Sequence, residues 1–217
     1  MTTLTLLLIR HGETALNAES RFRGRFDIDL NDRGRQQAEA LARGLPHSFP
    51  IDHIYSSPLK RCLETARPLA TALGLAVVAE PRLIDLDYGE WQGRLIEEVA
   101  EQSPQDYAAW LGPSVGRPVG PGDLSFRFPQ TRVAGGEPLG APAERLRSLI
   151  DDVAERHQGD VVAMVTHNVL CQMATCLLLN EPLESFQSVR HDPGNVSVFR
   201  WLNGTFREDG LNLAAME

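Results

Sequence analysis

The sequence predicts an α/β fold with a mostly parallel central sheet, because strand-like and helix-like segments alternate along the chain. Two uninterrupted apolar stretches, Leu6–Ile9 and Val161–Thr166, are typical of strands buried on both faces of such a sheet. A histidine follows each stretch closely, at His11 and His167. The 217 residues are enough for one large core, and we expect a single domain over residues 1–217.

The first half of the chain continues with helical and strand patterns in turn. After the first strand and a polar loop, apolar residues at helical spacing predict a helix over Asp32–Leu45, and a short strand follows at Ile51–Tyr55. We expect Ser57 to cap the next helix, with Pro58 in its first turn. Gly74 is expected to end that helix.

The second half begins with a strand predicted at Ala76–Ala79, and Arg94–Leu111 looks helical with an interruption at Pro104. Residues 112–142 include 13 glycines or prolines among 31 residues, which predicts a long irregular excursion. The remaining predicted elements are a helix at Glu144–His157, a strand at Val161–Thr166, a helix through Leu179 and a strand at Asn195–Trp201.

Composition argues against several classes of protein. No apolar stretch is long enough to cross a membrane and no basic signal-peptide region precedes one, so we expect a cytoplasmic protein with no membrane partner. The net charge of −8 argues against a nucleic-acid partner. Cys62, Cys171 and Cys176 lack metal-ligand spacing and lie in apolar, helix-like contexts, so we expect buried thiols and no metal site.

The strongest chemical signal is Arg10-His11-Gly12 at the end of the first strand. In open α/β sheets, ligands bind in the crevice beyond the carboxyl ends of the strands. A guanidinium disfavours protonation of a neighbouring imidazole, which suits a neutral, nucleophilic histidine beside a bound anion. Gly12 allows a tight turn and a close approach of the backbone to a ligand. The pattern therefore indicates phosphate chemistry.

Two further positions strengthen this interpretation. Arg61 falls in the first turn of a predicted helix, where free N–H groups and a bidentate guanidinium suit an anion. His167 ends a second buried strand and is followed by Asn168. One strand-end histidine is most simply a structural residue. Two of them, together with two arginines at strand-to-helix junctions, indicate a site.

These motifs resemble, in order, those of the histidine phosphatase superfamily, which has the phosphoglycerate mutase-like fold. The matching segments are Arg10–Asn17, Arg21–Gly34 with Arg23 where glutamine is common, Ser57–Ala66, Leu83–Gly93, Gly135–Glu137 and Thr166–His167. The resemblance implies a three-layer α/β/α sandwich with a mostly parallel sheet and an irregular lid insertion.

The resemblance also implies roles for the residues. His11 would attack phosphorus, while Arg10, Arg61 and His167 would surround the phosphoryl oxygens. The substrate-binding positions implied are Asn17, Arg23, Gly24 and Asn168. No metal or cofactor is needed, because the arginines supply the positive charge.

Two residues depart from the family pattern. Asp85 stands where the general acid is usually glutamate, so the carboxyl group is one methylene shorter. We favour Asp85 as the acid by position, with Asp87 and Glu90 as alternatives. Cys171 stands four residues after His167, where relatives often carry arginine.

Within the superfamily we expect a phosphomonoesterase acting on a small phosphorylated metabolite. The alternatives are a phosphoglycerate mutase and a non-catalytic phosphate-binding protein. The mutase subgroup carries a basic insertion after the acid, whereas this chain has Glu97, Glu98 and Glu101. The glycine- and proline-rich excursion is expected to cover the site. The partner is then a phosphate ester, and a homodimer is left open.

Overall fold

The computed structural model describes residues 3–111 and 133–214. The strands are β1 (Thr5–Arg10), β2 (His53–Ser56), β3 (Val77–Ala79), β4 (Val161–Thr166), β5 (Val196–Leu202) and β6 (Thr205–Leu213). Within the described residues they form one six-stranded sheet in the order β3-β2-β4-β1-β5-β6. The first four of these strands run parallel, and β5 and β6 pair antiparallel at one edge. The prediction of a mostly parallel sheet is confirmed.

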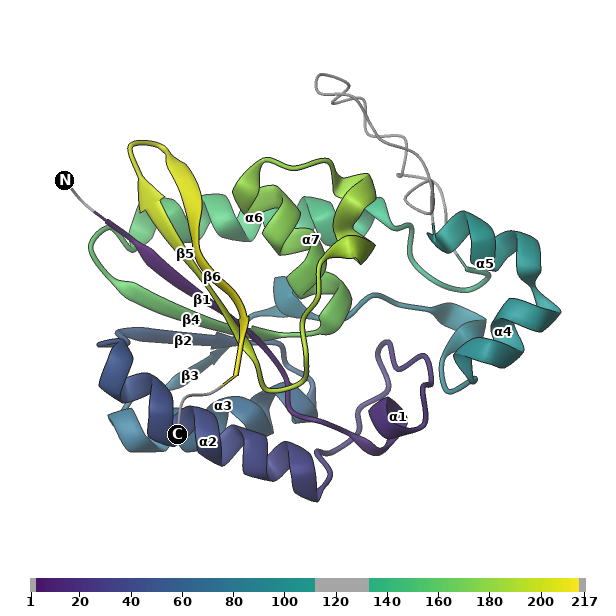
Figure 1. Ribbon diagram of the computed structural model, residues 1–217, viewed down its shortest axis with the longest axis horizontal. Coiled ribbons are helices and arrows are strands. Elements are labelled where there is room, and N and C mark those ends of the chain that lie inside the picture. The colour runs from purple at the N-terminus through teal and green to yellow at the C-terminus, as the bar shows by residue number, and fades with distance from the viewer. Residues whose placement is uncertain (1–2, 112–132, 215–217) are drawn as a thin grey trace.

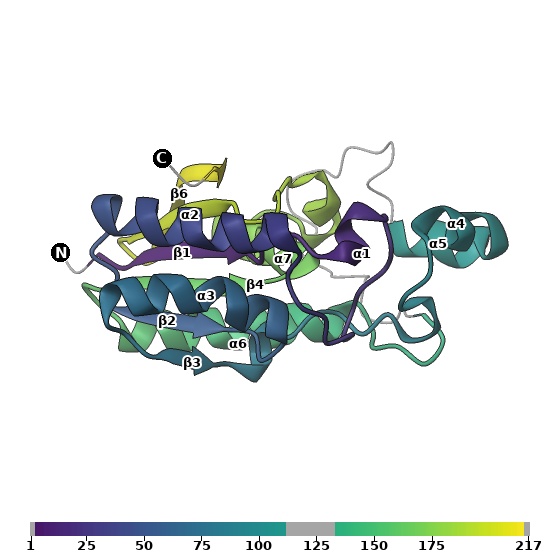
Figure 2. The same ribbon diagram turned by 90° about the horizontal axis from the view of Figure 1, so that it is seen from below.

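Helices cover both faces of the sheet. They are α1 (Ala15–Ala18), α2 (Asp32–Ser48), α3 (Lys60–Leu73), α4 (Ile96–Gln102), α5 (Pro104–Leu111), α6 (Gly140–Arg156) and α7 (Asn168–Leu179). Figure 1 shows α6 and α7 on one side of the sheet, and Figure 2 shows α2 and α3 on the other. The three-layer α/β/α sandwich is therefore confirmed.

The central strands divide their side chains between two hydrophobic cores. On β1, Leu7 and Ile9 join the core beneath α2 and α3, whereas Leu6 and Leu8 join the core beneath α6 and α7. β4 divides in the same way. Because successive side chains of a strand point to opposite faces, a strand buried on both faces is apolar throughout. This explains why the two stretches next to the histidines are unbroken apolar runs.

Helices α4 and α5 project from one end of the molecule (Figure 1). The predicted break at Pro104 is confirmed, since α4 ends at Gln102 and α5 begins at Pro104. The excursion predicted over residues 112–142 falls mostly outside the described residues, and α6 begins within it at Gly140. Across residues 3–111 and 133–214, the helices are too short or too polar to span a membrane.

The structure corrects the predicted start of α3. Ser57 does not cap this helix. It still continues the pairing of β2 with β4, since its backbone N–H donates to the Val165 carbonyl at 2.9 Å. The N-cap is Leu59, which makes no side-chain cap hydrogen bond. Gly74 ends α3 in the left-handed conformation, as predicted. Two elements were not predicted: α1 lies in a stretch that is polar overall, and β6 is a polar edge strand that buries few side chains.

Candidate active site

Two adjacent strands bring the two histidines together. Arg10, the last residue of β1, pairs with Thr166, the last residue of β4. The next residue continues this pairing, because the His11 N–H donates to the Thr166 carbonyl at 2.9 Å. His11 and His167 are fully buried, and their ring centroids lie 5.3 Å apart at 61°. The parallel register therefore accounts for the proximity that the sequence pattern predicted.

The turn after His11 depends on glycine. A Cβ atom on Gly12 would lie 2.5 Å from the Gly34 carbonyl oxygen, closer than van der Waals contact allows. The Gly12 N–H donates to the Thr65 hydroxyl at 2.9 Å. The turn is thus packed against α2 and hydrogen-bonded to α3, and the backbone at His11 is held from both helices.

His11 presents one unpartnered ring nitrogen. Its Nδ1 lies 2.6 Å from the Gly12 carbonyl oxygen, which can only accept, so Nδ1 carries the proton. Nε2 then holds a lone pair, and this buried atom has no hydrogen-bond partner among residues 3–111 and 133–214. Burial, followed by the charges of Arg61 and Arg10, holds the pKa of His11 well below its ordinary value. His11 is therefore a neutral imidazole with an unshared lone pair on Nε2, which is the state that a nucleophile requires.

Arg61 is fully buried and links the site together. Its guanidinium donates to the carbonyls of Phe26 and Gly24, each at 2.7 Å. It also donates to the Asp85 carboxylate at 3.0 Å and to the His167 ring at 3.2 Å. Guanidinium carries five N–H donors, so one remains for a ligand while these four hydrogen bonds persist.

His167 holds the opposite tautomer. Its Nδ1 accepts from the Arg61 side chain, which can only donate, so the proton lies on Nε2. That N–H points to the Ser57 hydroxyl at 2.8 Å. Burial, followed by the charge of Arg61, holds the pKa of His167 well below its ordinary value. His167 is thus a neutral hydrogen-bond donor.

His11, His167, Arg10 and Arg61 form one buried cluster. Asp85 is the carboxyl group that reaches this cluster. It is buried, and its Oδ2 lies 3.5 Å from the His167 Nδ1. Burial raises the pKa of Asp85 and outweighs the opposing charges of Arg61 and Arg23. The shorter side chain is therefore accommodated within contact distance of both His167 and Arg61.

The other two candidate acids lie elsewhere. Asp87 forms an ion pair with Arg25 at 3.5 Å and accepts from the Gly89 N–H at 2.9 Å. Glu90 is exposed. Neither carboxylate contacts His11, His167 or an arginine of the cluster among the contacts of the described residues, so geometry favours Asp85.

The Gly135–Glu137 motif positions the loop that carries the acid. Glu137 accepts from the Asp87 N–H at 3.0 Å and from Arg145 at 2.9 Å. Arg145 in turn donates to the Ile84 carbonyl at 2.7 Å. The backbone on both sides of Asp85 is therefore fixed by one ion pair that includes the motif's glutamate.

Arg10 lies at the opposite side of the cluster. It donates to the Asn168 side chain at 3.0 Å and to the His191 carbonyl, and its buried Nε has no partner in the described part of the chain. Burial and the neighbouring Arg23 lower the pKa of Arg10 to about 10, so it stays charged at neutral pH. The His191 side chain is buried, and its ring is hydrogen-bonded to the Thr175 hydroxyl at 3.1 Å.

The predicted substrate-binding residues fall into two groups. Arg23 and Asn168 line a cavity of about 190 Å³ next to Asp85. Gly24 binds Arg61 through its carbonyl rather than facing the cavity. Asn17 turns its amide oxygen back to the Thr14 backbone N–H at 3.0 Å as part of a helix cap. The structure therefore unites Arg23 and Asn168 with the cluster and gives Gly24 and Asn17 local structural contacts.

The cavity extends from the cluster towards α5 and α7. Its remaining lining residues are Arg21, Phe22, Tyr88, Ile96, Trp110, Val169, Gln172 and Gln187. Trp110 packs against Phe22 and also faces this space, with its indole Nε1 buried and without a partner in the described residues. The cavity thus combines aromatic walls with several unused N–H donors, which suits a polar organic group.

Sequence reasoning missed Ser57 and Trp110 as site residues. Ser57 was assigned to a helix cap because serine before proline is typical of helix starts. Trp110 lies in a predicted helical segment that carried no sign of a ligand contact. No local pattern indicates either contact, because His167 and the cavity residues come from distant parts of the chain.

The buried cysteines match their prediction. Cys62 touches the His167 ring with 3.5 Å between Sγ and Nε2, and burial raises the pKa of its thiol to about 12. Cys171 lies in the core beneath α7, and burial raises the pKa of its thiol as well. Both therefore stay protonated, and Cys171 offers no charge in place of the arginine that relatives often carry.

Together with Arg23 and Asp85, the active-site cluster has three arginines and one carboxylate. This composition repels divalent cations.

Comparison with known proteins places this arrangement in context. The family model of the histidine phosphatase superfamily (branch 1) matches residues 6–214. Phosphoserine phosphatase 1 of Hydrogenobacter thermophilus is 37% identical over 193 residues, which cover 89% of this chain and 84% of that protein. Glucosyl-3-phosphoglycerate phosphatase of Mycolicibacterium vanbaalenii is 32% identical, covering 94% of this chain and 86% of that protein.

Solved structures share the whole architecture. A mycobacterial glucosyl-3-phosphoglycerate phosphatase in complex with VO3 superposes with a TM-score of 0.80 at 25% identity, covering 98% of this chain and 100% of that chain. The α-ribazole phosphatase of Shigella flexneri gives a TM-score of 0.79 at 25% identity, covering 98% of both chains. The strands, layers and connections described above are therefore those of known phosphatases.

Proposed function

The chain belongs to branch 1 of the histidine phosphatase superfamily, and on that premise we propose that it works through a phosphohistidine formed at His11. It is a phosphomonoesterase that acts on a small phosphorylated metabolite, like its relatives named for phosphoserine and glucosyl-3-phosphoglycerate. The observation that carries the proposal is the buried Nε2 of His11, which has a lone pair, no hydrogen-bond partner in the described part of the chain, and arginines close by.

In the first step, the lone pair of His11 Nε2 forms a bond to phosphorus and the bond from phosphorus to the ester oxygen breaks. The leaving oxygen takes a proton from Asp85, whose raised pKa favours the protonated carboxyl group. The products are a phosphohistidine and a free alcohol. Because Asp85 is buried beside the cluster, the proton travels a short distance within a site of low polarity.

In the second step, water attacks phosphorus and gives a proton back to the Asp85 carboxylate. The bond from phosphorus to Nε2 breaks, and its electron pair returns to the imidazole. Inorganic phosphate leaves, and His11 and Asp85 regain their starting protonation states. The same carboxyl group thus serves as acid and then as base.

The arginines and His167 stabilise the charge that develops on the phosphoryl oxygens. The buried Nε–H of Arg10 has no acceptor among the described residues. Arg61 has one N–H that is not engaged in the hydrogen bonds described above. His167 offers the proton on Nε2, which now points to Ser57. Donors that are fixed in place before the reaction stabilise a transition state without reorganisation.

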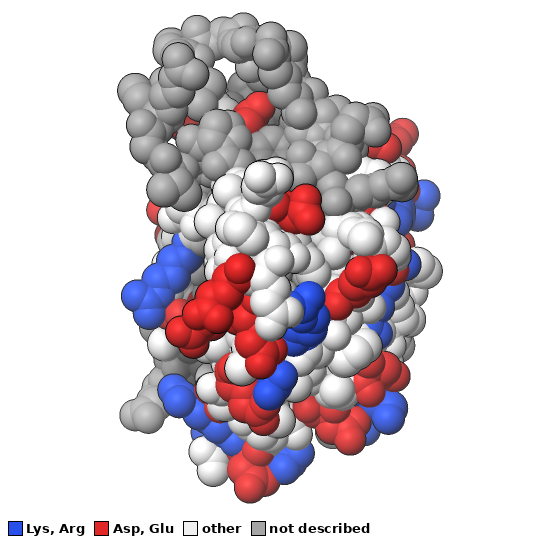
Figure 3. Space-filling model, turned by 90° about the vertical axis from the view of Figure 1, so that its right-hand side faces the viewer, with Lys and Arg blue, Asp and Glu red and all other residues white. Residues whose placement is uncertain are grey.

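The charge around the entrance favours hydrolysis over mutase chemistry. A mutase must retain its substrate's carboxylate until the phosphoryl group returns to it, which requires a closed, basic site. Here the segment from Leu95 to Leu111, which forms α4 and α5, contains no lysine or arginine. Glu97, Glu98 and Glu101 of α4 are exposed, and acidic side chains are spread over this end of the molecule (Figure 3).

The volume of the cavity favours a compact substrate. Its volume of about 190 Å³ is below that of pockets for drug-sized ligands, which start at about 300 Å³. Arg21 and Arg23 in its wall favour an anionic group next to the phosphate ester. We therefore expect a small phosphorylated acid, such as phosphoserine or a phosphoglycerate derivative, to be hydrolysed faster than a neutral sugar phosphate.

A phosphate-release assay tests this function. Purified protein is given phosphoserine, glucosyl-3-phosphoglycerate, 3-phosphoglycerate and glucose 6-phosphate, with and without EDTA. We expect phosphate release that EDTA does not reduce, with the phosphorylated acids preferred. In a parallel reaction with 3-phosphoglycerate and 2,3-bisphosphoglycerate, formation of 2-phosphoglycerate faster than phosphate release would overturn the proposal.

A homodimer, a cytoplasmic location and the lack of a nucleic-acid partner, all considered from the sequence, stay predictions. Size-exclusion chromatography with light scattering gives the oligomeric state directly.

A further inference from the structure

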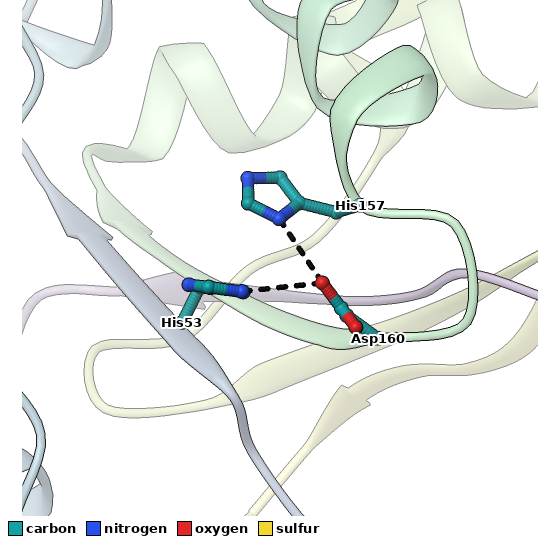
Figure 4. Close-up of side chains that lie close together, drawn as sticks. All are labelled: His53, His157 and Asp160. Carbon is teal, nitrogen blue, oxygen red and sulfur yellow. Dashed lines mark hydrogen bonds and ion pairs between the residues drawn. The ribbon is translucent and has the colours of Figure 1, made fainter.

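A second cluster of chemically active side chains, shown in Figure 4, lies at the amino-terminal ends of β2 and β4. His53 is the first residue of β2, Asp160 immediately precedes β4, and His157 follows the end of α6. The active-site histidines follow the carboxyl ends of β1 and β4. A strand rises about 3.3 Å per residue, so the length of β4 places the two clusters about 20 Å apart. The second cluster therefore takes no part in the phosphatase site.

The three side chains converge on one point. Asp160 Oδ2 lies 3.1 Å from His53 Nε2 and 3.2 Å from His157 Nδ1, and all three atoms lie within 4.8 Å of one another. In a tetrahedral zinc site with bonds of about 2.1 Å, neighbouring ligand atoms are about 3.4 Å apart. The observed spacing is close to this value, and small side-chain rotations would admit an ion.

The backbone around the cluster is fixed. The Asp52 side chain accepts from the Val161 N–H at 2.9 Å, and the Asp52 N–H donates to the Val161 carbonyl at 2.9 Å. These bonds lock the residues next to His53 and Asp160 in register. The Asp160 carbonyl also accepts from the Thr5 N–H at 2.9 Å. The ligand set is thus held by the strands themselves, which lowers the cost of ordering it around an ion.

Tyr55 lies where it can orient His157 for metal binding. Its hydroxyl lies 2.9 Å from the His157 Nε2, the ring nitrogen that does not face Asp160. Histidines that bind metals almost always donate the distal ring N–H to such a partner, which fixes the tautomer. When Nε2 donates to Tyr55, Nδ1 turns a lone pair toward the Asp160 carboxylate. In this tautomer, an ion bound by Nδ1 and the Asp160 carboxylate would take the place of the hydrogen bond that Nδ1–H makes to Asp160 in the other tautomer.

We propose that His53, His157 and Asp160 bind one divalent transition-metal ion, with Zn²⁺ fitting best. Two imidazoles and one carboxylate are typical ligands of zinc, whereas Mg²⁺ and Ca²⁺ prefer oxygen ligands alone. The side chains of His53 and Asp160 are 44% and 34% exposed, so an ion can enter from solvent and water can complete its coordination. The ion would join α6 to β2 and β4, and its effect is on stability.

Titration of the untagged, EDTA-treated protein with ZnCl₂ in a calorimeter tests this site. We expect one ion per chain and a rise in the melting temperature. Co²⁺ should bind and give the visible absorption of a low-coordinate complex, while MgCl₂ should leave the melting temperature unchanged. H53N, at the most exposed ligand, and H157Q should each abolish these effects, and Tyr55→Phe should weaken binding about tenfold.

His47→Asn is the matched control, because His47 is an exposed histidine of α2 that is not one of the three clustered residues. It should bind Zn²⁺ like the parent protein. If the parent binds no Zn²⁺, or if H53N and H157Q bind it unchanged, the proposal is wrong and the cluster is a hydrogen-bonded contact only. Neither result bears on phosphatase activity, which is measured separately in the presence of EDTA.

Discussion

His11 and His167 meet edge to face with 5.3 Å between their ring centroids, yet their hydrogen-bond partners assign them opposite tautomers. His11 donates through Nδ1 and leaves Nε2 free, whereas His167 accepts at Nδ1 and donates through Nε2. In the proposed mechanism, His11 would therefore attack phosphorus through Nε2 and His167 would donate to an oxygen. The carbonyl of Gly12 and the guanidinium of Arg61 set this difference.

The first prediction concerns the general acid. Asp85→Asn removes the proton that the leaving group needs, so hydrolysis of an alkyl phosphate should fall by about 10²–10⁴-fold. p-Nitrophenyl phosphate has a good leaving group and should lose far less. Steady-state rates on both substrates measure the contrast. Asp87→Asn and Glu90→Gln serve as controls, and an equal loss on the two substrates in Asp85→Asn would assign Asp85 a binding role instead.

The second prediction concerns substrate binding. Arg23→Gln removes a cation that lines the cavity beside Asp85, so KM should rise more than kcat falls. Arg25→Gln is the matched control, since Arg25 pairs with Asp87 and Glu137 at a more exposed position. Kinetics on the preferred substrate of the phosphate-release panel give both constants. An unchanged KM in Arg23→Gln, or an equal rise in Arg25→Gln, would contradict the placement of Arg23.

The third prediction concerns the dependence of stability on pH. Burial is the largest cause that lowers the pKa values of His11 and His167, and it lowers that of His191 to about 4. Below the ordinary histidine pKa of about 6.5, the unfolded chain binds protons that the folded chain does not, so stability falls as pH falls. Each histidine contributes a loss of about 1.4 kcal/mol per pH unit in that window. The raised pKa of Asp85 acts in the opposite direction.

Urea unfolding without phosphate at pH 7.5, 6.5 and 5.5 measures this slope. His191→Gln lacks one of the three groups, so between pH 6.5 and 5.5 its stability should fall by about 1 kcal/mol less than that of the parent protein. A parent protein that is equally stable at pH 6.5 and 5.5 would show that the buried histidines gain protons without unfolding.

The fourth prediction concerns the turn after His11. Gly12→Ala places a Cβ atom 2.5 Å from the Gly34 carbonyl oxygen, which should cost about 1–3 kcal/mol and displace His11. Activity should fall with stability. Gly74→Ala is the control, because a Cβ atom there has no neighbour within 4 Å among the described atoms and strains only a left-handed backbone. Denaturant unfolding and phosphate release report the two effects, and full activity in Gly12→Ala would contradict the packing argument.

The sequence predicted what depends on local pattern. Apolar stretches located β1 and β4, and residues directly after their ends, His11 and His167, meet as parallel pairing requires. The position of Asp85 within its motif was also informative, since the structure brings this carboxylate to Arg61 at 3.0 Å.

Contacts between residues that are far apart in the sequence could not be predicted from local patterns. Ser57 carries the features of a helix cap and instead meets His167 through the pairing of β2 with β4. No local pattern links His53 to His157, because nothing in the sequence shows that β2 and the end of α6 come together. The polar β6 also escaped prediction, since an exposed edge strand need not alternate apolar and polar residues.

The central claim is that His11 carries the phosphoryl group, and direct trapping tests it. Enzyme mixed with a ³²P-labelled substrate is quenched without acid, because phosphohistidine is labile to acid, and the labelled peptide is sequenced. We predict label on His11 in the parent protein, and both label and phosphate release lost in a folded His11→Ala variant. Label on a serine or on His167, or undiminished phosphate release by His11→Ala, would contradict the account.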